Sequence, residues 1–204
     1  MDSRPTTDRR VIWRIIVVMV AAFVVLAVAV LVGLVRHVQH QRAVIERLSA
    51  FSLCSVFASY EPYRRDRGGD APWGYWIHGQ RPFWADWLGR IVDGDPFAEI
   101  QEVWMAVQPG QEFLDSDMSV FQELPGLRRL VLTSTGITDD GAALLAKNTK
   151  LVDLYLKGTA ISDRTLLILD KLPELRELDV TQTKVTKKAV DEFRKRHPDC
   201  LVFD

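Results

Sequence analysis

A motif that returns every 24 residues near the end of the chain limits most strongly what this sequence can fold into. Its three copies begin at Leu127, Leu151 and Leu175, and each has apolar residues at its first, fourth and sixth positions. A fixed period of this size predicts a solenoid, because a repeat buries its apolar edge only by stacking on a neighbour. An irregular earlier copy, Ile100–Met105, has the same apolar spacing. We therefore expect four short parallel strands side by side.

Each repeat also predicts a short helix after its strand. Residues of N-cap type stand ahead of these helices, since a short side-chain oxygen accepts a backbone N–H there; they are Thr138, Ser162 and Thr186. Pairs spaced three apart should turn inward from the helices; they are Ala142 and Leu145, Leu166 and Leu169, and Val190 and Phe193. Stacked threonines should bond to backbone groups of adjacent turns; they are Thr135, Thr159 and Thr183.

The repeat resembles that of the bacterial leucine-rich repeat proteins, whose repeats read LxxLxLxxTxITDxGLxxL. The matching residues include Leu127, Leu130, Leu132, Thr135, Ile137, Thr138, Asp139 and Gly141. The ending from Arg196 through Cys200 is similar to the terminal LPNC of that group, and Trp84–Phe97 resembles its WLxxLLGDDFF leader. The third repeat departs from the pattern with Lys187-Lys188. The resemblance implies a leucine-rich repeat solenoid of parallel strands and convex helices, an α/β fold that binds protein and has no cofactor or catalytic activity.

A second segment predicts a membrane anchor. Ile15–Val35 contains no polar side chain over 21 residues, and a helix of that length spans the roughly 30 Å hydrocarbon core. A cleaved signal peptide is the alternative, since Ala27-Val-Ala29 has the small-x-small form of a cleavage site. The apolar run continues past that site to Val35, which favours an uncleaved signal anchor. A small excess of arginine before the span favours a cytoplasmic N-terminus and extracytoplasmic repeats.

These patterns divide the chain into four parts. Residues 1–14 form a tail, 15–35 the transmembrane helix, 36–99 a juxtamembrane segment, and 100–204 the repeat domain with a charged C-terminal cap helix. Within 36–99 we expect a helix over Gln39–Ala50, a strand over Ser55–Tyr60, and a loop over Glu61–Gln80. A helix over Pro82–Val92 would cover the open edge of the first strand of the solenoid.

Five aromatic residues gather in this middle segment, namely Trp73, Tyr75, Trp76, Trp84 and Trp87. Three interpretations stay open. The rings pack the N-terminal cap, lie at the membrane interface where amphipathic rings are favoured, or form a platform for a glycan or peptide.

Motifs for chemistry are missing from the sequence. His37 and His40 share a helix face without a third metal ligand nearby, and no nucleophile elbow or phosphate-binding glycine loop occurs. Cys200 is interpreted as a small buried hydrophobe, with a disulfide to Cys54 as the alternative. The net charge is −1, without the large basic face of a nucleic-acid-binding protein. We expect no enzyme, no metal, no cofactor, no nucleic acid and no small-molecule substrate.

The candidate binding site is the strand face turned away from the helices. Its predicted residues alternate with the buried leucines and are Glu102, Trp104, Arg129, Val131, Asp153, Tyr155, Lys157, Glu177 and Asp179. Glu102, Arg129 and Asp153 should form an exposed charge ladder, beside an apolar stripe of Trp104, Val131 and Tyr155. Aromatic anchors with a charged border are typical of protein-binding hot spots, although a merely solvated sheet face has the same pattern.

Three functional hypotheses follow. The first is a membrane-anchored module that binds a protein of unknown identity through this face. The second is an envelope spacer without a specific ligand. The third is a glycan or peptide binder that uses the Trp-rich segment 73–87.

Overall fold

The computed structural model describes residues 9–51, 54–59, 74–78, 99–106 and 112–204. They belong to two compact units, one holding the chain up to His40 and the other starting at Gln41. Helix α1, Arg9–Ser49, continues without a break for 41 residues. It is long and apolar enough to cross a membrane, although an N-terminal signal sequence would meet the same criteria. The predicted span and the predicted helix over Gln39–Ala50 are therefore parts of one helix.

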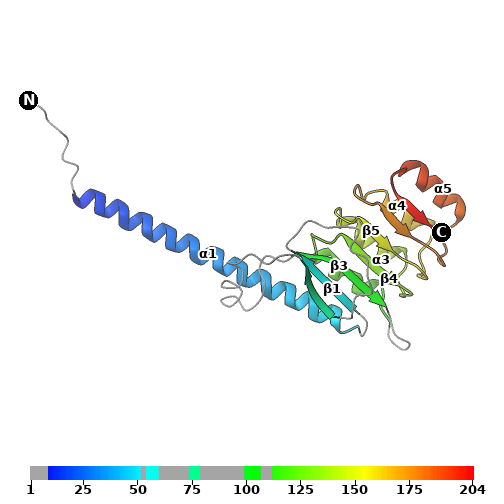
Figure 1. Ribbon diagram of the computed structural model, residues 1–204, viewed down its shortest axis with the longest axis horizontal. Coiled ribbons are helices and arrows are strands. Elements are labelled where there is room, and N and C mark those ends of the chain that lie inside the picture. The colour runs from blue at the N-terminus through cyan, green and yellow to red at the C-terminus, as the bar shows by residue number, and fades with distance from the viewer. Residues whose placement is uncertain (1–8, 52–53, 60–73, 79–98, 107–111) are drawn as a thin grey trace, which may run out of the picture. The chain divides into compact units, whose positions relative to one another are not determined.

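The second unit is built on one sheet of seven strands (Figure 1). The strands are β1 Cys54–Ser59, β2 Gly74–His78, β3 Glu99–Ala106, β4 Arg129–Thr133, β5 Asp153–Tyr155, β6 Glu177–Asp179 and β7 Leu201–Phe203. Their order is β2-β1-β3-β4-β5-β6-β7. β1 and β3 are antiparallel, and all other neighbours are parallel.

The strand register follows the sequence repeat. Leu130 pairs with Leu154, Leu154 with Leu178, and Leu178 with Val202, so each step along the sheet is one 24-residue repeat. β3 joins in parallel with Val103 opposite Leu130. The four predicted strands are thus confirmed. Residues 201–203, for which no strand was predicted, add a further strand.

Short helices follow the strands on one side of the sheet. They are η1 Asp115–Glu123, α3 Asp139–Leu144, η2 Leu145–Lys147, α4 Asp163–Leu169 and α5 Lys187–Arg196. All six residues of the three inward pairs are buried, as predicted, and pack against the strand leucines in a single hydrophobic core. The end of α1 contributes Val44 and Leu48 to the same core, with Phe51 packed against it. These three residues therefore form the buried face at the end of this segment.

Consecutive repeats are joined by a ladder of aspartates at the helix starts. Thr138, Ser162 and Thr186 are the N-caps of α3, α4 and α5, as predicted. Each cap donates from its backbone N–H and its hydroxyl to an aspartate 23 residues earlier. The O–O distances are 2.6 Å from Thr138 to Asp115, 2.5 Å from Ser162 to Asp139, and 2.9 Å from Thr186 to Asp163. Repeat stacking is therefore fixed by polar contacts as well as by the leucines.

The prediction for the stacked threonines was wrong. Thr135, Thr159 and Thr183 each donate a hydroxyl hydrogen bond to the carbonyl three residues earlier, within their own repeat. These carbonyls belong to Leu132, Leu156 and Val180, at the point where each strand ends. The hydroxyl satisfies a carbonyl that would otherwise face the interior at the bend.

The middle segment differs from the prediction in two respects. Gly74–His78, expected in a loop, forms β2 and pairs in parallel with β1; Tyr75, Trp76 and Ile77 are residue types that favour strands. The edge of β3 is covered by β1, whereas a helix over Pro82–Val92 was expected there. Residues 82–92 lie outside the described residues.

The alternative disulfide between Cys54 and Cys200 is also excluded. Cys200 is a buried thiol beside β7, and Cys54 belongs to β1. Five steps across the sheet separate these strands. At about 4.8 Å per step their Cα atoms are roughly 24 Å apart, far beyond the roughly 7 Å that a disulfide spans.

Candidate functional site

The strand residues that face away from the helices form two rows across the sheet. The first row is Glu102, Arg129, Asp153, Glu177 and Leu201, each opposite the next in register. The second row is Trp104, Val131, Tyr155, Asp179 and Phe203. We call these ten residues the sheet face. Eight of the nine predicted site residues are brought together in it, and Lys157 lies two residues beyond the end of β5.

The charge ladder of the first row exists, but it is buried. Arg129 donates to Asp153 Oδ2 from Nη2 at 2.7 Å and from Nε at 3.0 Å, and its Nη1 lies 3.4 Å from Glu102 Oε2. The exposed fractions are 7% for Glu102, 5% for Arg129 and 0% for Asp153. The expectation of an exposed ladder was therefore wrong. Alternation along a strand predicts which face a residue shares, but not whether that face is covered.

The burial of these three charges makes the ladder a rigid part of the site. A buried guanidinium between two carboxylates is tolerated because each charge keeps a hydrogen-bonded partner of opposite sign. Glu102 Oε2 also lies 3.4 Å from the indole Nε1 of Trp104. The ladder thus connects the first row to the second.

The aromatic stripe of the second row is half-buried. Trp104, Val131 and Tyr155 all keep part of their surface exposed. The Tyr155 hydroxyl donates to Glu177 Oε1 at 2.6 Å. Burial raises the pKa of Tyr155 well above its ordinary value, and the hydrogen bond to the Glu177 carboxylate adds to the increase. Tyr155 therefore stays a neutral donor with a fixed ring.

The β7 end of the sheet face contains two apolar residues that were not predicted from the sequence as part of the site. Leu201 is 54% exposed and Phe203 is 41% exposed. Both lie 24 residues beyond predicted site residues, Glu177 and Asp179, and pair with them in register. Extending the 24-residue repeat by one step would have found them.

Exposure changes along the sheet face from one end to the other. The first row is buried on β3, β4 and β5, half-buried at Glu177 on β6, and exposed at Leu201 on β7. Asp179 is half-buried, and Lys157 is exposed. Contact with a partner is therefore open to the second row and to Glu177 and Leu201 of the first row, whereas Glu102, Arg129 and Asp153 support the face from within.

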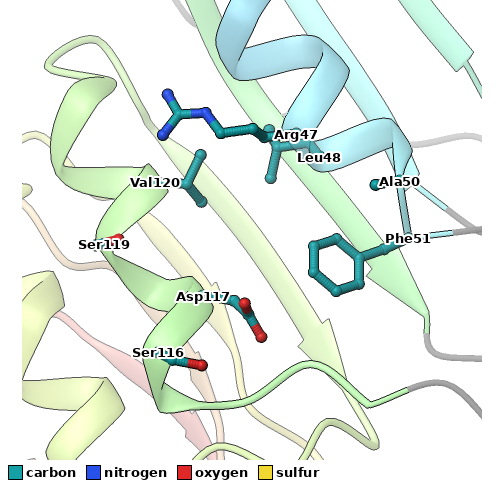
Figure 2. Close-up of a pocket in the computed structure, with 8 residues that line it drawn as sticks. All are labelled: Arg47, Leu48, Ala50, Phe51, Ser116, Asp117, Ser119 and Val120. Atoms are coloured by element: carbon teal, nitrogen blue, oxygen red, sulfur yellow. The ribbon is translucent and has the colours of Figure 1, made fainter.

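A separate groove lies between the last turn of α1 and η1 (Figure 2). Its volume is about 320 Å³, and it is lined by Arg47, Leu48, Ala50, Phe51, Ser116, Asp117, Ser119 and Val120. Arg47 forms a two-pronged ion pair with Glu123, at 2.8 and 2.6 Å. The bond to Glu123 raises the pKa of Arg47. Phe51 meets Phe113 edge to face at 4.9 Å. These contacts join the end of α1 and Phe51 to η1 and Phe113.

The remaining predicted features are placed only in part. Tyr75 and Trp76 belong to β2, whereas Trp73, Trp84 and Trp87 lie outside the described residues. Within the described part of the chain, no group of three or more His, Cys, Asp or Glu side chains could hold a metal ion. No protein-family model matches the chain, and no curated protein matches it.

Proposed function

We propose that this chain is a membrane-anchored leucine-rich repeat protein that binds another protein through the sheet face. Support comes from the 24-residue register of β4 to β7 and from the capped helices on the opposite side. A solenoid of this kind has its strands on the concave side and its helices on the convex side, so the sheet face becomes its concave surface.

One observation carries the binding role. Half-buried Trp104, Val131 and Tyr155 stand in register in one row, which ends at exposed Phe203. Aromatic side chains fixed in place lose little entropy on binding and supply most of the energy at protein interfaces. Here Tyr155 is fixed by Glu177. Trp104 lies beside Glu102 of the buried ladder.

The apolar part of α1 serves in this proposal as an uncleaved signal anchor. The repeats are then tethered outside the cytoplasm, and the partner is an envelope, secreted or neighbouring-cell protein. The proposed function includes no catalytic step and no cofactor.

Replacing the anchors of the aromatic row tests the proposal. Trp104→Ala with Tyr155→Ala is expected to weaken capture of cross-linked partners at least about tenfold, as for hot-spot aromatics. Leu167→Ala is the control, because Leu167 is an exposed apolar residue of α4, outside the sheet face. Circular dichroism of the purified variants verifies that they fold.

Two outcomes would count against this function. Partners that remain bound to the double variant would remove the sheet face from the interface. If no partner survives moderate salt and detergent even with the wild-type chain, the envelope spacer becomes the better account.

A further inference from the structure

The accessible end of the sheet face places a carboxylate between two aromatic rings. Tyr155 of β5, Asp179 of β6 and Phe203 of β7 are consecutive partners in the second row. Adjacent strands are about 4.8 Å apart, so neighbouring side chains on one face are within reach of the same ligand group. This arrangement combines the two features that attract a cation, a negative charge and aromatic faces.

Asp179 has one oxygen engaged and one available. Its Oδ1 accepts from the Thr181 backbone N–H at 2.8 Å and from the Thr181 hydroxyl at 2.7 Å. Among the described residues, no Lys, Arg or His forms an ion pair with Asp179. The carboxylate is thus held in position by a neutral partner, and its charge is not neutralised within the chain that the structure describes.

The neighbours of this carboxylate strengthen the same preference. Glu177 lies in the adjacent row and accepts a hydrogen bond from the hydroxyl of Tyr155, the residue opposite Asp179 in register. Leu201, opposite Glu177, is more than half exposed. A complementary partner segment therefore presents a positive side chain next to an apolar one.

We propose that Tyr155, Asp179 and Phe203 form a binding site for a Lys or Arg side chain of the protein partner, with Leu201 contacting an adjacent apolar residue of it. This inference rests on the proposed function, because it names the chemistry of the partner at the same face. Electrostatic complementarity of this kind gives specificity and sets the register of the bound segment.

Two synthetic peptides test the site directly. One is fluorescein-labelled Gly-Ser-Leu-Lys-Leu-Lys-Leu-Ser-Gly, and the other has Glu in place of both Lys. Binding is measured by fluorescence anisotropy to the full chain in nanodiscs of zwitterionic phosphatidylcholine, because anionic lipids would attract the basic peptide themselves. We expect the Lys peptide to bind at least about tenfold more tightly than the Glu peptide, with a preference that falls as salt rises.

Two substitutions in the chain assign that preference to the site. Asp179→Asn retains an oxygen that accepts from Thr181 but removes the charge, and it should weaken binding of the Lys peptide about fivefold to tenfold. Phe203→Ala removes one aromatic face and should weaken it about twofold to fivefold. Asp140→Asn, an equal change of charge on the exposed side of α3, is the matched control and should leave the affinity unchanged.

The proposal is overturned if the Glu peptide binds as tightly as the Lys peptide, if neither binds, or if Asp179→Asn has no more effect than Asp140→Asn. Such a result is distinguishable from failure of the proposed function. In that case capture of the protein partner would still be lost in the Trp104→Ala, Tyr155→Ala variant, while Asp179→Asn would leave it intact.

Discussion

Asp139 shows how one residue connects two repeats. It is the first residue of α3, where a negative charge is favoured by the helix N-terminus. Its carboxylate also accepts from the Ser162 N–H, the Ser162 hydroxyl and the Thr165 hydroxyl of the next repeat. Lys187 occupies the equivalent place in α5, the last helix of the described series. The third repeat therefore departs from the DxG pattern at the position where α3 and α4 begin with the aspartate that bonds to the next cap.

Replacing this carboxylate should make the protein less stable near neutral pH and less sensitive to acid. Burial raises the pKa of Asp139, but the bonds from Ser162 and Thr165 lower it more, to a net value below the ordinary 3.8. A group whose pKa is lower in the folded state than in the unfolded state stabilises the fold at pH values above its unfolded pKa. This contribution is lost as the pH falls through the folded-state pKa. We expect Asp139→Asn to lower the free energy of unfolding by about 1–2 kcal/mol at about pH 7, with partial exposure reducing the effect.

Urea denaturation of the full chain in detergent checks this expectation at about pH 7 and about pH 2.5, on either side of the ordinary carboxyl pKa. The difference between Asp139→Asn and wild type should shrink at the lower pH. Asp140→Asn is the control, because Asp140 is exposed and, among the described residues, forms an ion pair with exposed Arg164 alone, at 3.0 Å. An equal loss of unfolding free energy in both variants would mean that the aspartates at the helix starts add nothing beyond surface charge.

At the scale of elements, the buried ladder joins three strands that the leucines already align. Glu102, Arg129 and Asp153 come from β3, β4 and β5, and they pair in register. A one-residue slip of any strand would move its charge to the opposite face, into the apolar core. The ladder therefore specifies register, which three-residue strands such as β5 define only weakly by backbone pairing.

Removing the cation of this ladder should be costly. Arg129→Met leaves the buried carboxylates of Glu102 and Asp153 without the guanidinium between them, and we expect a loss of about 3–5 kcal/mol in the free energy of unfolding. The triple variant Glu102→Gln, Arg129→Met, Asp153→Leu removes all three charges and should recover most of that loss. Chemical denaturation of the two variants and the wild type measures both effects. A triple variant no more stable than Arg129→Met would show that the cost lies in packing of the Arg129 side chain.

The elements that could be predicted from sequence are those with a repeated pattern. Leu130 and Leu154 define strands by alternation, and Thr138 and Ser162 mark helix starts by residue type. The burial of Arg129 could not be predicted in this way, because a single strand pattern does not reveal what covers the outer face. β2 was missed for a related reason, since Gly74–His78 has no copy elsewhere and pairs with a non-repeating strand, β1. Adding one 24-residue step to Glu177 and Asp179 would have placed Leu201 and Phe203 on the sheet face. Their exposure, however, conflicts with the ordinary expectation that apolar residues are buried.

At the scale of the whole molecule, α1 belongs to both parts of the protein. Its N-terminal stretch is apolar around its whole circumference, as a membrane helix is. Its last turns carry Val44 and Leu48, which are buried in the repeat domain. The Arg47 ion pair to Glu123 joins the same turns to η1. The chain therefore passes from the apolar stretch to the buried face of the repeats within one continuous helix.

This continuity leads to a prediction about topology. In the proposed topology α1 is an uncleaved signal anchor, and the arginines before it lie on the cytoplasmic side. Protease that reaches the outer surface of the membrane containing α1 should then digest a C-terminal tag. This digestion should not require lysis of the membrane that contains α1. An N-terminal tag should stay protected and should remain on the same polypeptide, because cleavage after Ala29 would separate it from the repeats. A C-terminal tag protected until lysis would place the repeats in the cytoplasm and direct the search for partners to soluble cytoplasmic proteins. Loss of the N-terminal tag from an otherwise intact repeat domain would instead identify residues 15–29 as part of a cleaved signal, and the sheet face would then act on a released protein.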